Sequence, residues 1–308
     1  MATRRPTIRL GWAVCGLLAL PAPADAPRRE PASLVAVLER ALDGERGWPR
    51  IKAAEALAEH GHPGRAFDAL AGDADTAPSP ERIGVWRVLA RSAPTATGRQ
   101  GFLDRIRKAA VAPDGPDRVH AVEALAKLGA YCEADRPVIE ALAAGDPVAA
   151  AFPRWYLALS GRRDDEARLV ELLDASDPVA RWRAAYATAR LKEPSAAARA
   201  AVAGRAEREP QDSPARTVVV AAAYLVADDA GRDRWHRLLV DALAAGSDAS
   251  RAVGYEALGR SGMPADLALL DAATASPDGS VRVAASSAAL HILRRGRSPS
   301  TEFKGPRE

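Results

Sequence analysis

The 308-residue sequence has little cysteine and few aromatic residues. Cys15 and Cys132 are its two cysteines, and Cys15 lies in an N-terminal segment that we expect to be removed, so neither an intrachain disulfide nor a cysteine-based metal cluster is predicted. Aromatic residues make up 5% of the chain and hydrophobic residues 48%, so the apolar content is mainly Ala, Leu and Val. This composition favours closely packed helices, because Ala has the highest helix propensity.

The sequence also lacks a strong excess of charge of one sign. It carries 43 basic and 40 acidic residues, a formal net charge of +3. Arg4, Arg5 and Arg9 precede the first acidic residue, Asp25, and without them the numbers are 40 and 40. A neutral chain lacks the overall positive field of a general nucleic-acid binder, although a local basic face stays possible.

Signatures of common active sites are missing as well. The sequence contains no Gly-rich phosphate loop, no Gly-x-Ser-x-Gly elbow and no His-Glu-x-x-His motif. The five histidines, at positions 60, 62, 120, 236 and 291, are scattered and predict no metal site. We therefore predict a protein that is not an enzyme and that has no catalytic residue, metal or cofactor.

The first 24 residues have the order of a secretory signal peptide. Three arginines precede an apolar stretch over residues 10–20, and Ala22-Pro23-Ala24 supplies a small-residue cleavage site. Eleven apolar residues are fewer than the roughly 20 that span a bilayer. We predict cleavage after Ala24, export to the periplasm or the extracellular space, and no membrane span in the mature chain.

Eight copies of a short pattern run through the rest of the chain. Arg50-Ile51-Lys52-Ala53-Ala54-Glu55-Ala56-Leu57 is the clearest, followed by residues 118–125. Aligned on their last apolar position, the copies end at Leu57, Leu89, Leu125, Leu157, Thr188, Leu225, Leu258 and Ala289. Their spacing of 31 to 37 residues is typical of stacked helical repeats, in which each unit buries its apolar face against its neighbours.

Turn residues recur at fixed offsets from these copies. Asp146-Pro147 and Asp177-Pro178 combine a helix-capping Asp with a Pro at the first helical position. Four glycines stand four residues after an aligned Leu, where a helix end favours a left-handed residue: Gly61, Gly129, Gly161 and Gly262. Pro153 falls inside a predicted helix and should kink it.

These features resemble the HEAT-repeat family, in particular its short bacterial variety named after phycobilisome-lyase repeats. The matching features are Asp-Pro-x-Val, an Arg at the start of the second helix, Ala-Ala-x-Ala-Leu and a Gly, over residues 32–293. The resemblance implies an all-α, right-handed α-solenoid of about eight helical hairpins. Residues 25–31 are then a short linker and residues 294–308 a disordered tail, and Ser286 and Ser287 would keep the outer side of the last helix polar.

An arginine column occupies the second position of the aligned pattern. We interpret it as a structural ladder in which each Arg bonds the turn of an adjacent unit; an anion-binding stripe is the alternative. The column consists of Arg50, Arg82, Arg118, Arg181, Arg251 and Arg282.

A group of aromatic and basic residues lies on the second helices in the middle of the chain. Trp155 and Tyr186 share the seventh aligned position, which should face away from the helix pair, and Arg154, Trp182 and Arg183 adjoin them. Such a patch could anchor a protein partner or stack nucleic-acid bases; packing between Ala-rich helices is the alternative.

Together these observations predict an exported, non-enzymatic scaffold that binds an unidentified protein partner on its concave face. Two alternatives stay open: a nucleic-acid-binding protein of the same fold, similar to HEAT-like DNA glycosylases, and a chromophore lyase or its helper. The neutral mature charge and the leader argue against nucleic acid. Only the repeat type supports the lyase.

Overall fold

The computed structural model describes residues 30–297, and there the chain is entirely helical. This confirms the all-α prediction. The α-helices are α1 (Pro31–Gly44), α2 (Gly47–Glu59), α3 (Pro63–Ala71), α4 (Glu81–Ser92), α5 (Ala96–Val111), α6 (Arg118–Leu128), α7 (Arg136–Ala143), α8 (Pro147–Leu159), α9 (Arg163–Glu171), α10 (Pro178–Thr188), α11 (Ala196–Arg208), α12 (Arg216–Val226), α13 (Asp229–Ala245), α14 (Asp248–Ser261), α15 (Leu267–Ala273) and α16 (Gly279–Arg297). Short 3₁₀ turns lie at Glu133–Asp135, Leu172–Asp174 and Pro264–Asp266.

The predicted leader and most of the predicted linker and tail lie outside the described residues. Helix α16 continues four residues past the predicted end at 293, so Arg294 and Arg295 are helical. No helix within residues 30–297 has the length and apolar character needed to cross a membrane.

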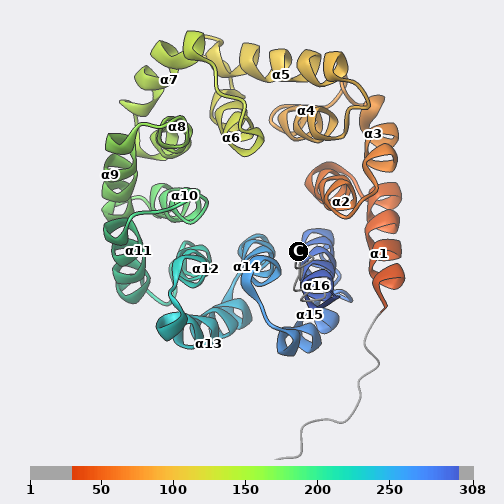
Figure 1. Cartoon of the computed structure of the whole chain (residues 1–308), viewed down its shortest axis with the longest axis vertical. Helices are drawn as coiled ribbons and strands as arrows, with labels where there is room; N and C mark the ends of the chain where they lie inside the picture. The colour runs from red at the N-terminus through yellow and green to blue at the C-terminus, as the bar shows by residue number, and fades with distance from the viewer. Residues whose placement is uncertain (1–29, 298–308) are drawn as a thin grey trace, which may run out of the picture.

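The helices form two concentric layers (Figure 1). Odd-numbered helices make an outer frame, and even-numbered helices stand inside it and are seen end-on. Every aligned copy of the sequence pattern lies on an even-numbered helix, from Leu57 on α2 to Ala289 on α16. The repeated sequence unit is therefore an outer helix followed by an inner one.

The two ends of the helical region meet, so the inner layer closes into a ring. Helix α16 packs against both α1 and α2 (Figure 1). We expected Ser286 to lie on a polar outer face of the last helix, and this was wrong: Ser286 is fully buried. The last helix needs no polar cap because the first two helices cover it.

The predicted helix ends are correct in most copies. The carboxylate of Asp146 accepts the Val148 N–H at 2.8 Å, and that of Asp177 accepts the Val179 N–H at 2.6 Å. Three of the four turn glycines have positive φ: Gly61, Gly129 and Gly161.

Gly262 is the exception among these glycines, with φ −69°. A Cβ at this position would lie 2.4 Å from the Leu258 carbonyl oxygen, so close approach and not a left-handed backbone requires glycine here.

The core is one continuous apolar cluster that runs through both layers. Small residues set the closest approach of two inner helices: a Cβ on Gly259 of α14 would lie 2.9 Å from the Cα of Ala288 on α16. Val218, Val219 and Val220, the one β-branched run of the chain, are helical and buried in α12. Pro153 lies inside α8, which continues to Leu159.

Candidate functional site

The seventh aligned position supplies most of the side chains that meet at the centre of the ring. This position lies two residues before the aligned apolar residue of each inner helix. It holds Glu55, Arg87, Glu123, Trp155, Tyr186, Ala223, Glu256 and Ser287. Residues that occupy the same position in different repeat units therefore lie together at the centre of the ring.

Charged side chains of four inner helices and of the turn after α10 form what we call the central ion network: Lys52, Glu55, Arg87, Glu123, Lys127, Arg190 and Glu256. Arg87 on α4 donates two hydrogen bonds of 3.1 Å to the carboxylate of Glu55 on α2. Across the ring, the Lys52 ammonium lies 3.1 Å from the Glu256 carboxylate on α14. Arg190, in the turn after α10, reaches the other oxygen of Glu256 at 3.4 Å.

These pairings keep the central carboxylates ionised. Burial alone would raise the pKa of Glu55, but Arg87 and Lys52 outweigh burial and hold that pKa well below its usual value. The same balance lowers the pKa of Glu123 to about 2, with Lys127 and Arg87 as the compensating cations. Arg87 is 3% exposed, whereas Lys52 and Glu256 are 31% and 30% exposed, so the network is buried at the Arg87–Glu55 pair and reached by solvent at the Lys52–Glu256 pair.

Trp155 and Tyr186, two aromatic residues of the predicted partner-binding patch, lie beside this network. They are 2% and 6% exposed, and their rings meet edge to face with centroids 6.1 Å apart. The guanidinium carbon of Arg190 lies 3.4 Å from the Tyr186 ring centroid, and the Lys127 ammonium lies 5.4 Å from it. Both rings are buried, and the side chains that contact them come from α6, α8, α10 and the turn after α10.

The other three predicted patch residues are partly exposed. Arg154 forms an ion pair with Asp165, which is buried, at 2.5 Å. Arg183 donates to the Val148 carbonyl at 2.7 Å, and its guanidinium lies 5.6 Å from the Trp182 ring centroid.

Trp182 and Arg183 belong to a group in the first half or the middle of four inner helices, which we call the mouth cluster: Trp48, His120, Phe152, Trp182 and Arg183. Trp48 on α2 and His120 on α6 lie 6.3 Å apart between ring centroids. Burial, followed by the charge of Arg183, lowers the pKa of His120, although Glu123 opposes the shift. His120 Nδ1 and Arg183 Nε are buried and have no hydrogen-bond partner within residues 30–297.

Four arginines of the predicted column bond across the junction to the next unit. Arg50 donates to the Ala69 carbonyl at 2.6 Å, and Arg82 donates to the Asp117 carboxylate at 2.5 Å. Arg181 holds Glu209 in a bidentate pair at 2.8 and 3.0 Å.

Arg282 extends this series around the ring, because it pairs with Glu45 at the other end of the helical region. Two column members differ. Arg251 pairs with Asp248 of its own helix. Arg118 has a buried Nε that no described acceptor reaches.

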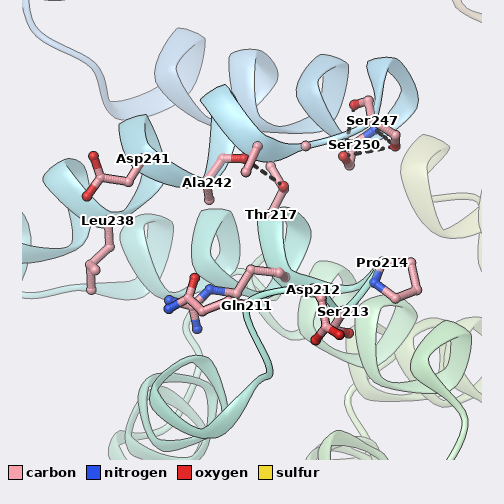
Figure 2. A pocket seen from close by; sticks show the side chains of 13 residues that line it. Gln211, Asp212, Ser213, Pro214, Thr217, Leu238, Asp241, Ala242, Ser247 and Ser250 are labelled. Atoms are coloured by element: carbon pink, nitrogen blue, oxygen red, sulfur yellow. Dashed lines mark hydrogen bonds between the residues drawn. The ribbon is translucent and has the colours of Figure 1, made fainter.

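A separate hollow of about 340 Å³ lies between the turns that lead into α12 and α14 (Figure 2). Hydroxyl and carboxyl groups line it, including Ser213, Thr217, Ser250, Asp212 and Asp241. The Thr217 hydroxyl is already used, because it donates to the Ala242 carbonyl at 3.2 Å.

Sequence reasoning missed the central ion network and the contribution of Trp48 to the mouth cluster. The signal was present, since the seventh position reads Glu, Arg and Glu in the first three copies, at residues 55, 87 and 123. Lys52 and Glu256 lie in copies far apart in sequence, and their pairing depends on ring closure.

The described residues 30–297 contain no group of three or more His, Cys, Asp and Glu side chains that could hold a metal ion. No family model matches the chain, and no curated protein matches it. A search of solved structures finds a similarity to the crystal structure of an engineered protein, with 19% sequence identity and a TM-score of 0.29. The match covers 84% of this chain and 78% of that one.

Proposed function

We propose that this chain is a HEAT-like repeat protein of eight helical hairpins, wound as a right-handed solenoid, and that it serves as a non-enzymatic scaffold for a protein partner. The support is the placement of every aligned copy on an inner helix and the packing of those helices into one continuous core. Repeat proteins of this kind present large preformed surfaces, which lower the ordering cost of binding.

The partner surface is the mouth cluster and not the ring centre. Trp182, Arg183 and Trp48 are partly exposed, whereas Trp155 and Tyr186 are buried. Trp and Arg are the residue types that most often dominate binding energy at protein interfaces. The partly exposed Trp182 stacked with Arg183 is the observation that carries this assignment.

Copurification with the tagged full chain from its native cells tests this proposal. We expect Trp182→Ala to reduce recovery of the bound protein at least tenfold, since loss of an aromatic anchor costs about 2 kcal/mol or more. The matched control is Tyr131→Ala, because Tyr131 is 36% exposed and lies in the turn after α6, outside the cluster. Equal recovery with both variants, at unchanged helicity, would overturn the assignment.

Nucleic acid is the competing partner for an aromatic and basic surface. Arg154 is neutralised by Asp165, which weakens the basic character of the patch and favours a protein partner. Binding of single-stranded DNA that weakens steeply between 50 and 200 mM salt, on the order of a thousandfold, would instead support the nucleic-acid alternative.

We also propose export of the mature chain, on the strength of the leader sequence. The intact mass of the endogenous protein in separated cell fractions tests this. A periplasmic or secreted species that begins at Asp25 is expected. A cytoplasmic species that retains Met1 would contradict export.

A further inference from the structure

Polar side chains of α2 and α16 meet where the ring closes. His60, near the end of α2, is 2% exposed, and its Nε2 lies 3.2 Å from the Ser287 hydroxyl on α16. The His291 ring lies beside it, with centroids 4.5 Å apart. Arg294 donates to the backbone carbonyls of both Glu59 and His60, the first at 3.1 Å. We call these residues the closing seam.

The closing seam holds more groups that can be positive than negative. His60, His291 and Arg294 face one carboxylate, that of Glu59, which lies 3.7 Å from His291 Nε2. That carboxylate is shared, because Arg91 on α4 also pairs with Glu59.

Glu55, one turn earlier on α2, repels the Glu59 carboxylate and is itself paired with Arg87. No carboxylate is therefore free to neutralise a second positive imidazole in the seam.

The unpaired nitrogen of His60 makes a charge there still less favourable. His60 Nδ1 is buried and has no hydrogen-bond partner among the described residues. A protonated imidazole carries N–H groups on both nitrogens. One of them would then be buried without an acceptor, beside the guanidinium of Arg294 and the ring of His291.

We propose that the closing seam is an acid-sensitive latch: protonation of His60 separates α16 from α1 and α2 and opens the ring. The released helices expose His60 to water, where the charged ring is solvated. The helices stay folded and adjacent units elsewhere stay packed together, because His60 lies only at the seam between the first and last units.

The direction of the equilibrium follows from the electrostatics of the seam. Burial first, and then the charges of His291 and Arg294, lower the pKa of His60 from 6.5 to about 4. In the opened ring the same group returns towards 6.5, so the open form binds the proton more tightly. Closure is therefore unaffected above pH 6.5 and becomes progressively weaker as the pH falls from 6.5 towards 4.

Energy transfer between two dyes on the full chain tests the latch. The dyes are placed at Arg40→Cys on α1 and Ala268→Cys on α15, both exposed positions on either side of the seam, with Cys15 and Cys132 replaced by Ser. A control pair at Asp68→Cys and Asp104→Cys spans the outer helices α3 and α5, away from the seam. Helicity is followed by circular dichroism in the same samples.

We expect transfer across the seam to fall between pH 7.5 and 4.5 while the control pair and the helicity stay constant. His60→Gln keeps a polar side chain but cannot be charged, so it should lower the midpoint by at least one pH unit. His291→Gln removes one repelling charge and should lower the pH midpoint of opening by less than His60→Gln does. This second variant tests the latch independently if His60→Gln does not fold. Constant transfer across the seam, simultaneous loss at both pairs, or an unchanged midpoint in the variants would each overturn the latch.

Discussion

The centre of the ring and its closing seam are both polar, and both join helices that are far apart in sequence. They differ in charge balance. In the centre, the Arg87 guanidinium is matched by the Glu55 carboxylate in a bidentate pair, and Lys52 is matched by Glu256. In the seam, three groups that can be positive share one carboxylate, that of Glu59.

This difference predicts opposite responses to the same perturbation. A balanced buried pair is damaged most when one partner is removed, because the other is left buried and uncompensated. An unbalanced cluster is damaged most when the pH adds a charge that it cannot neutralise. Four measurements separate the two regions, in order of expected size.

Removal of Arg87 should have the largest effect. Arg87→Ala leaves the buried Glu55 carboxylate without its bidentate partner, and we expect a loss of about 3–5 kcal/mol in the free energy of unfolding. The matched control is Arg91→Ala, one turn further along α4, because Arg91 is 30% exposed and should cost about 1 kcal/mol or less. Urea denaturation at pH 7.5 measures both losses. Equal losses would show that the Arg87–Glu55 pair contributes no more to stability than an exposed ion pair does.

The pH dependence of stability should show two windows. The lowered pKa of His60, about 4 against 6.5, removes about 3 kcal/mol as the pH falls from 6.5 to 4, because the unfolded chain takes the proton first. His120, whose pKa is also lowered, acts in the same direction.

The central carboxylates respond at lower pH. Glu123, with a pKa of about 2 against 4.5, stabilises the fold above pH 4.5 and loses that contribution as the pH falls towards 2. Denaturant midpoints across pH 7.5 to 2.5 measure both windows. His60→Gln should reduce only the loss of stability between pH 6.5 and 4. If the loss below pH 4.5 were reduced as well, the seam and the centre would not respond to pH independently.

Two arginines of the column allow an interior junction to be compared with the junction that closes the ring. Arg181→Ala should cost about 2–3 kcal/mol, since Glu209 is left buried. Arg282→Ala should cost about 1 kcal/mol, because Arg282 and Glu45 are 26% and 30% exposed.

Arg251→Ala, whose arginine pairs only within its own helix, is the control for both and should change stability by less than about 0.5 kcal/mol. Thermal denaturation ranks the three. A larger loss at Arg282 than at Arg181 would mean that the closing junction is the stronger of the two.

Added salt should have the smallest effect. Between 0.1 and 1 M salt the screening length falls from about 10 to about 3 Å. This weakens the repulsion of His60 by the partly exposed His291 and the exposed Arg294 more than the attraction within the buried Arg87–Glu55 pair. We expect the midpoint of ring opening to move to lower pH by about 0.3 units. The penalty of Arg87→Ala should not change measurably, and a strong salt dependence of that penalty would contradict its burial.

Local sequence predicted the elements well and the site poorly. Asp146 and Asp177 cap their helices because the capping bond needs only the next two or three residues. Trp155 and Tyr186 were expected on an accessible surface, but they are buried among side chains of α6, α8 and α10, and such packing between helices cannot be read from one helix alone. Gly262 lacks the predicted left-handed backbone, and a side chain there is instead excluded by the Leu258 carbonyl and the Asp266 side chain, which local sequence does not reveal.

Local sequence patterns are enough to predict that this chain is helical, which helices repeat one another and several of the helix ends. These features depend on neighbouring residues: the spacing of apolar side chains, the caps and the turn glycines. Ring closure, in contrast, depends on the tertiary structure. Each unit is rotated slightly relative to the one before it, and these rotations must add up over all units for the two ends to meet. Close contacts such as that of Gly259 with Ala288 help to set that rotation. Closure then paired Lys52 with Glu256 and brought His60 beside His291 across 231 residues of sequence.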